Sequence, residues 1–156
     1  LGSKRPRVGL VWSGNARHKR DRARSIPLYA LLPLFDLDAT FVSLHKEVRA
    51  TDAAVLQQSA KVIDVSPELE TFADTAALIA QLDLVIAVDT GVAHLAGALG
   101  KPLWLLLPTA PDWRWLTGRS HTPWYPSARL FRQNETRAWG PVVAQVRAAL
   151  HELIAG

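Results

Sequence analysis

Four residues that could form an anion-binding turn follow an apolar run in the middle of the chain. Asp89, Thr90 and Gly91 come directly after that run, and His94 stands four residues after Thr90. Aspartate and threonine begin helices, so the pattern predicts a strand that leads into a helix over 90–99. The first amides of a helix have no partner within it and carry positive potential, so a phosphate fits there. Gly91 presents no side chain to obstruct an anion, and His94 lies on the same helix face, within reach of a phosphate or a ribose. An ordinary helix cap with tight packing is the other interpretation.

A cluster of basic residues follows the first apolar run. It covers 15–25 and contains one acid, Asp21, among six basic residues: Arg17, His18, Lys19, Arg20, Arg22 and Arg24. Such a cluster suits nucleotide phosphates, nucleic acid or an acidic surface, and a solvated loop is the alternative. His45 and Lys46, after the second apolar run, are either ligand contacts or part of a solvated strand end.

The composition limits the class of protein. Of the 156 residues, 49% are apolar and 21% are charged, which is typical of a soluble domain with one core. No apolar run is long enough to span a bilayer, we find no signal peptide, and cysteine is absent, so we expect a cytoplasmic protein. Methionine is absent even at position 1, which indicates a piece of a longer protein.

Several nucleotide and metal motifs are missing from the sequence. No glycine precedes Lys101 at the spacing of a Walker loop, and Gly14 stands alone after the first apolar run, so the dinucleotide glycine pattern is absent. Histidine, aspartate and glutamate nowhere have the spacing of metal ligands, and no nucleophile elbow occurs. These observations argue against an ATPase, a dehydrogenase and a metal site.

Strands and helices alternate in the hydrophobic pattern. We expect strands at 7–14, 39–46, 61–66, 83–89, 101–108 and 128–133. We expect helices at 25–37 with Ser25 as a candidate cap and Pro27 in the first turn, 49–60 with Thr51 or Asp52 as cap, 68–82, 90–99 closed by Gly100, and 140–156. Mostly apolar strands indicate a parallel sheet covered on both faces. The prediction is a single Rossmann-like three-layer α/β domain with a mostly parallel sheet of about six strands, which binds ligands beyond the carboxyl ends of the strands.

The chain resembles the C-terminal half of a GT-B glycosyltransferase over nearly its whole length. The most specific part is "DTAALIAQLDLVIAVDTGVAHLAGALGKPLWLLLP" (74–108), and the resemblance extends to "VGLVWSGN", "RSIPL", "FVSLHKE", "DWRWL" and "PWYPSARLFRQ". More narrowly, it is similar to glycosyltransferase domains that follow tetratricopeptide repeats in bacterial proteins. Those domains are related to heptosyltransferases and more distantly to protein O-GlcNAc transferases. The resemblance implies that residues 1–156 are the domain of a GT-B fold that binds the nucleotide-sugar donor.

The resemblance also implies roles for individual residues. In the heptosyltransferase pattern, the aspartate-threonine-glycine turn cradles the donor diphosphate, and here it matches Asp89, Thr90 and Gly91, with His94 at the position of a histidine. The donor is linked to UDP or ADP, and no metal or other cofactor is expected. The general base usually comes from the N-terminal domain, so no catalytic residue is assigned.

Two further matches lie near the N-terminus. In heptosyltransferases, a cation three residues before a proline contacts donor phosphate. Here Arg24 stands three residues before Pro27, with arginine in place of lysine and without the tryptophan that precedes the proline. Ser13, Gly14 and Asn15 match the first-strand loop that faces the cleft.

Three functions remain open at this point. The first is donor binding for transfer of a sugar to a protein or glycan acceptor, with an N-terminal domain and tetratricopeptide repeats as parts of the longer protein. The second is a non-catalytic module that binds a protein through the basic cluster or the aromatic-rich stretch 109–128, which we interpret mainly as cover for the sheet edge. The third, binding of nucleic acid, ranks last because aromatic residues are not interleaved with the basic run.

Overall fold

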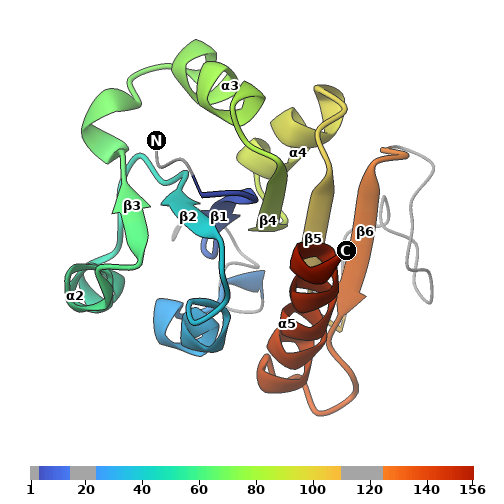
Figure 1. Cartoon of the computed structure of the whole chain (residues 1–156). Helices are drawn as coiled ribbons and strands as arrows, with labels where there is room; N and C mark the ends of the chain where they lie inside the picture. The colour runs from blue at the N-terminus through green and yellow to red at the C-terminus, as the bar shows by residue number, and fades with distance from the viewer. Residues whose placement is uncertain (1–3, 15–23, 110–124) are drawn as a thin grey trace.

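The protein is an α/β domain built on one six-stranded sheet (Figure 1). This computed structural model describes residues 4–14, 24–109 and 125–156. Every strand pair is parallel, and the strand order is β3-β2-β1-β4-β5-β6. The strands are β1 (Arg7–Val11), β2 (Thr40–Ser43), β3 (Val62–Asp64), β4 (Leu84–Val88), β5 (Leu103–Leu107) and β6 (Ala128–Arg132). The predicted fold class is confirmed, and this order is that of doubly wound nucleotide-binding sheets.

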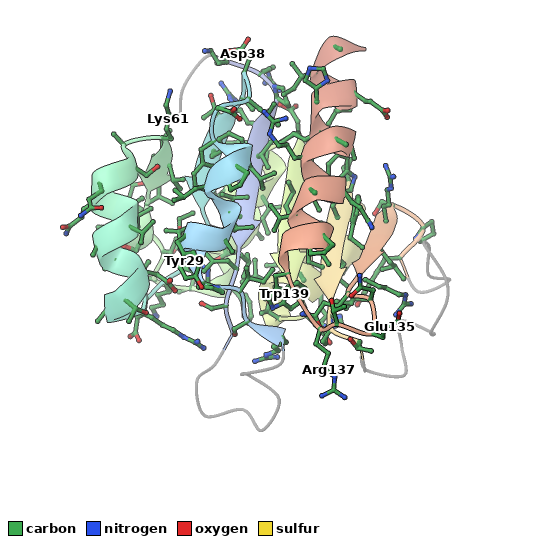
Figure 2. All side chains as sticks on the ribbon, turned by 90° about the horizontal axis from the view of Figure 1, so that it is seen from below. Tyr29, Asp38, Lys61, Glu135, Arg137 and Trp139 are labelled. Atoms are coloured by element: carbon green, nitrogen blue, oxygen red, sulfur yellow. The ribbon has the colours of Figure 1, made fainter. Side chains whose placement is uncertain are left out.

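Helices cover both faces of the sheet and give the domain three layers. One face packs against η1 (Leu28–Leu34), α2 (Ala50–Ser59) and α5 (Gly140–Ala155), which Figure 2 shows side by side. The other face packs against η2 (Ser66–Glu68), α3 (Phe72–Ala80) and α4 (Gly91–Ala98). Alternate strand residues enter the two cores: Leu84 and Ile86 face the first set of helices, and Val85 and Ala87 face the second.

The central pair of strands determines where a ligand can bind. β1 and β4 are neighbours, with Val8 opposite Leu84 and Val11 opposite Ala87. After β1 the chain reaches η1 on one face, whereas after β4 it enters α4 on the other. Because the two connections leave in opposite directions, they separate at the carboxyl ends of the strands, where doubly wound sheets bind ligands.

The segment predicted as a helix over 25–37 differs from the expectation. It forms only the 3-10 helix η1, and Pro27 is its N-cap residue, in extended conformation, rather than part of its first turn. Pro33 lies inside the segment and has no N–H to donate, so a regular α-helical ladder cannot continue through it. The Ser25 hydroxyl, expected as the helix cap, instead accepts a hydrogen bond from the Gly14 N–H at 3.1 Å.

The start of α2 is also corrected. Arg49 occupies the N-cap position, so neither Thr51 nor Asp52 caps the helix. Asp52 is buried, and its carboxylate accepts from the Trp12 indole N–H at 3.2 Å and from the Leu28 N–H at 3.0 Å. A buried carboxylate needs such donors, and here they join α2 to β1 and η1.

The helix expected over 68–82 begins later than predicted, at a capping box. Thr71 caps α3: its hydroxyl accepts from the Asp74 N–H, and the Asp74 carboxylate accepts from the Thr71 N–H. The N–H groups of Thr71 and Glu70 hold the pKa of Asp74 below its ordinary value. Glu68, expected inside the helix, ends the short η2 turn.

We expect Asp52→Ala to lower the free energy of unfolding by about 3 kcal/mol, because two buried N–H donors would lose their acceptor. Urea unfolding measures this. Asp38→Ala is the control, since Asp38 is at the surface (Figure 2) and pairs with Lys4, and it should cost less than about 1 kcal/mol. Equal losses in the two variants would contradict a structural role for Asp52.

Candidate anion-binding site

The start of α4 lies directly after β4 and has the geometry of an anion site. Thr90 is the N-cap in extended conformation, and its hydroxyl accepts from the Ala93 N–H and donates to the Val88 carbonyl, both at 3.3 Å. The hydroxyl therefore fixes the turn. The first amides of a helix have no backbone acceptor within it and add to the positive end of its dipole; of these, the Ala93 N–H is taken by the Thr90 hydroxyl. The predicted strand, cap and closure by Gly100, whose φ is +71°, are confirmed.

The two glycines of α4 have different surroundings. At Gly97, an added Cβ would lie 2.6 to 2.9 Å from ring atoms of Tyr125, so only glycine lets that ring lie against the helix. At Gly91, an added Cβ would meet only Phe72 Cζ, at 3.6 Å, which is an ordinary contact. Packing therefore explains Gly97 but not Gly91, which is exposed at the start of the helix.

His94 is held between two side chains. Its Nε2 lies 2.9 Å from Asp89 Oδ1, and its Nδ1 lies 3.1 Å from the Tyr125 hydroxyl. Because a carboxylate only accepts, the proton of the neutral ring is assigned to Nε2, and Tyr125 then donates to Nδ1. Both ring nitrogens thus have partners within the chain. The Asp89 and His94 side chains are 21% and 23% exposed, so both still border solvent.

Arg24 joins the first-strand loop to this turn. Its Nη1 donates to the Asp89 carbonyl at 2.8 Å, and its guanidinium lies against Gly14, where an added Cβ would be 2.3 Å from Nη2. The first-strand loop and the start of α4 therefore meet at Arg24 and Asp89. A side chain at position 14 would displace the Arg24 guanidinium from the place that it occupies here.

A second guanidinium reaches the same loop from α2. Arg49 Nη2 donates to the Gly14 carbonyl at 2.9 Å. Sequence reasoning missed this residue, because Arg49 stands alone in the sequence and only the fold brings it to Gly14. Ser13 is buried, and Asn15 lies outside the described residues, as do the other basic residues of the 15–25 cluster before Arg24.

His45 and Lys46, which follow β2, have different surroundings. Lys46 Nζ donates to the Glu70 carbonyl at 3.0 Å, at the exposed end of the strand near α3. His45 is neither a ligand contact nor solvated: it is buried, and its Nε2 accepts from the Trp12 N–H at 3.1 Å. The pKa of His45 is lowered to about 4, mainly by burial; the nearby charge of Asp52 opposes this shift and that of Arg49 adds to it.

Two negative findings apply to the part of the chain that the structure describes. No group of three histidine, cysteine, aspartate or glutamate side chains there is arranged to hold a metal ion. No helix among those residues has the length and apolar character needed to cross a membrane. The aromatic stretch is described only from Tyr125 onward, so Trp113, Trp115 and Trp124 lie outside the description.

The fold and the site define a doubly wound α/β domain with a cationic turn between its central strands. Residues 40–146 match glycosyltransferase family 9 (heptosyltransferase). The chain therefore belongs to that family, which confirms the heptosyltransferase part of the resemblance.

Two proteins similar to this chain are longer than it. Protein FlbA of Caulobacter vibrioides is 32% identical over 159 residues, covering 96% of this chain and 26% of FlbA. The structure of E. coli ADP-heptose LPS heptosyltransferase II superposes with a TM-score of 0.66 at 24% identity, covering 99% of this chain and 48% of that one. The chain thus has the fold of about half of that enzyme and spans about a quarter of FlbA.

We expect the free energy of unfolding to fall as the pH falls from about 6.5 to about 4. In this range His45 is protonated in the unfolded chain but stays neutral in the folded chain. From the pKa of about 4, the contribution is about 3 kcal/mol when fully lost. Urea unfolding at pH 7, 5.5 and 4.5 measures it. His45→Gln keeps an acceptor for the Trp12 N–H without titrating, so its stability should depend less steeply on pH.

His45→Asn is the matched control for the lost hydrogen bond, because asparagine is shorter and does not titrate either. It should lower stability at every pH while showing the same shallow slope as His45→Gln. Parallel pH curves for wild type and both variants would show that His45 does not carry this dependence.

Proposed function

We propose that this chain binds the nucleotide-diphosphate-sugar donor of a glycosyltransferase that transfers the sugar to a protein or glycan acceptor. Membership of family 9 supports a sugar-transfer role. The observation that carries the proposal is the hydrogen bond from Arg24 to the Asp89 carbonyl, because it places a guanidinium at the start of α4. A guanidinium beside helix amides suits a diphosphate in charge and in geometry.

In this proposal, each residue of the turn has a separate role in binding the donor. The diphosphate meets the amides after Thr90, and Gly91 leaves the approach open. The Asp89 carboxylate would repel a phosphate, so it acts through its backbone and by holding His94. His94 faces the ribose or phosphate side of the donor, and Lys46 adds positive charge after β2, on the far side of β1.

The proposed chemistry is stabilisation of the leaving group. Cleavage of the bond between sugar and diphosphate leaves extra negative charge on the nucleotide diphosphate. Helix amides and the Arg24 guanidinium stabilise that charge at the moment it develops, without reorganising. Use of a UDP- or ADP-linked donor without a metal is part of the proposal.

The rest of the reaction lies beyond these residues. No general base is assigned, because the proposal places it in an N-terminal acceptor domain of the longer protein. The isolated chain, taken as the donor-binding domain over residues 1–156, is therefore expected to bind a nucleotide and transfer nothing. The cytoplasmic location and the attachment to tetratricopeptide repeats stay predictions.

We expect Gly91→Asp to weaken binding of the matching nucleoside diphosphate by about tenfold or more, because the new carboxylate repels the diphosphate at the helix start. Calorimetric titration with UDP, ADP and GDP, each against its monophosphate, measures this. Aspartate is favourable in the first turn of a helix, so the variant should stay folded and at least as stable as the wild type.

Gly140→Asp is the matched control. Gly140 is the first residue of α5, nothing lies within 4 Å of an added Cβ, and α5 covers the other face of the sheet. This variant adds the same charge at the same helical position and should leave nucleotide affinity within twofold. If the folded full-length protein bound none of the diphosphates, the proposal would fail in favour of an interaction module. Steep salt dependence with no preference for a diphosphate would favour nucleic acid.

A further inference from the structure

An exposed phenylalanine stands at the edge of the proposed diphosphate site. Phe72 is the first residue of α3, and 65% of its surface is exposed. It shares a helix stripe with Thr75 and Ile79, both of which are buried under α3. The ring therefore continues the inward-facing stripe of the helix beyond the point where the core ends. Exposing so much apolar surface is unfavourable, and the core gains little from this ring.

The ring reaches the start of the neighbouring helix. α3 and α4 pack against each other on the same face of the sheet (Figure 1). Phe72 Cζ lies 3.6 Å from the place where a Cβ on Gly91 would be. An anion on the first amides of α4 would thus lie beside one end of the ring, with the rest of the aromatic surface exposed.

The backbone on both sides of Phe72 is fixed. Asp74 accepts from the N–H groups of Glu70 and Thr71, both at 3.0 Å, and its own N–H donates to the Thr71 hydroxyl. Lys46 donates to the Glu70 carbonyl at 3.0 Å. These bonds hold the start of α3 against the end of β2, so the ring is presented from a rigid position. Preorganisation of this kind lowers the entropy lost when a ligand binds.

We propose that Phe72 is the stacking platform for the nucleobase of the donor, an inference that rests on the proposed function. A nucleoside diphosphate combines an anion with a flat aromatic ring, which matches a cationic helix start beside an exposed aromatic side chain. Every base has a π-face, so a phenylalanine contributes affinity for a nucleoside without selecting one base by hydrogen bonds. Phe72 is thus the residue that separates a nucleotide from a simple diphosphate.

The test compares a diphosphate ligand that carries a base with two that do not. The full-length protein and its Phe72→Ala variant are titrated with the best-bound nucleoside diphosphate, with ribose 5-diphosphate and with inorganic pyrophosphate. Tyr29→Ala is the matched control, because Tyr29 is 64% exposed and belongs to η1, on the other face of the sheet (Figure 2). Circular dichroism and unfolding confirm that the variants are folded.

We expect Phe72→Ala to weaken binding of the nucleoside diphosphate by about tenfold and to leave the affinities for both base-free ligands within twofold of wild type. Phe72→Trp should restore or strengthen nucleotide binding, and Tyr29→Ala should change nothing. Equal weakening of all three ligands would overturn the platform while the diphosphate site stands. Unchanged affinity of the Phe72→Ala variant for the nucleoside diphosphate would also overturn it. If no diphosphate binds the wild type, both the platform and the proposed function fail.

Discussion

The separation of the chain at the ends of β1 and β4 is the constraint on which the candidate site depends. The two strands are adjacent and parallel, but η1 and α4 carry the chain to opposite faces of the sheet. This topology alone leaves a crevice between the two connections at the carboxyl ends of β1 and β4. The hydrogen bond from Arg24 to the Asp89 carbonyl spans that crevice, and the Arg24 guanidinium gives it positive charge.

A buried polar network supports the β1 side of this crevice. Trp12, at the end of β1, donates its N–H to His45 and its indole N–H to Asp52, while its carbonyl accepts from Ile26 at 2.7 Å. The tryptophan is 1% exposed, so each of these groups would be costly to leave unpaired. The network therefore fixes the position at which the chain leaves β1, two residues before Gly14.

The strands and α4 were predictable because their signals are local. Short, mostly apolar runs indicate the strands, and Thr90 and Gly100 bound α4 by side-chain and backbone preferences that act within a few residues. The 3-10 geometry of η1 does not follow from the apolar pattern, because it depends on Pro33, which has no N–H for an α-helical ladder. Two contacts join segments that are distant in the sequence, so no local pattern predicts them: Arg49 with Gly14, and Tyr125 with His94.

The scarcity of side chains in α4 has two separate causes. Ala93 and Ala96 are fully buried in the core of their face, and Gly97 gives way to the ring of Tyr125, whose hydroxyl reaches His94 from there. Tight packing explains those residues. It does not explain Gly91, which is exposed and would tolerate a Cβ without a clash. A position that internal packing leaves open, at the positive end of a helix, is where an external anion gains from the absence of a side chain.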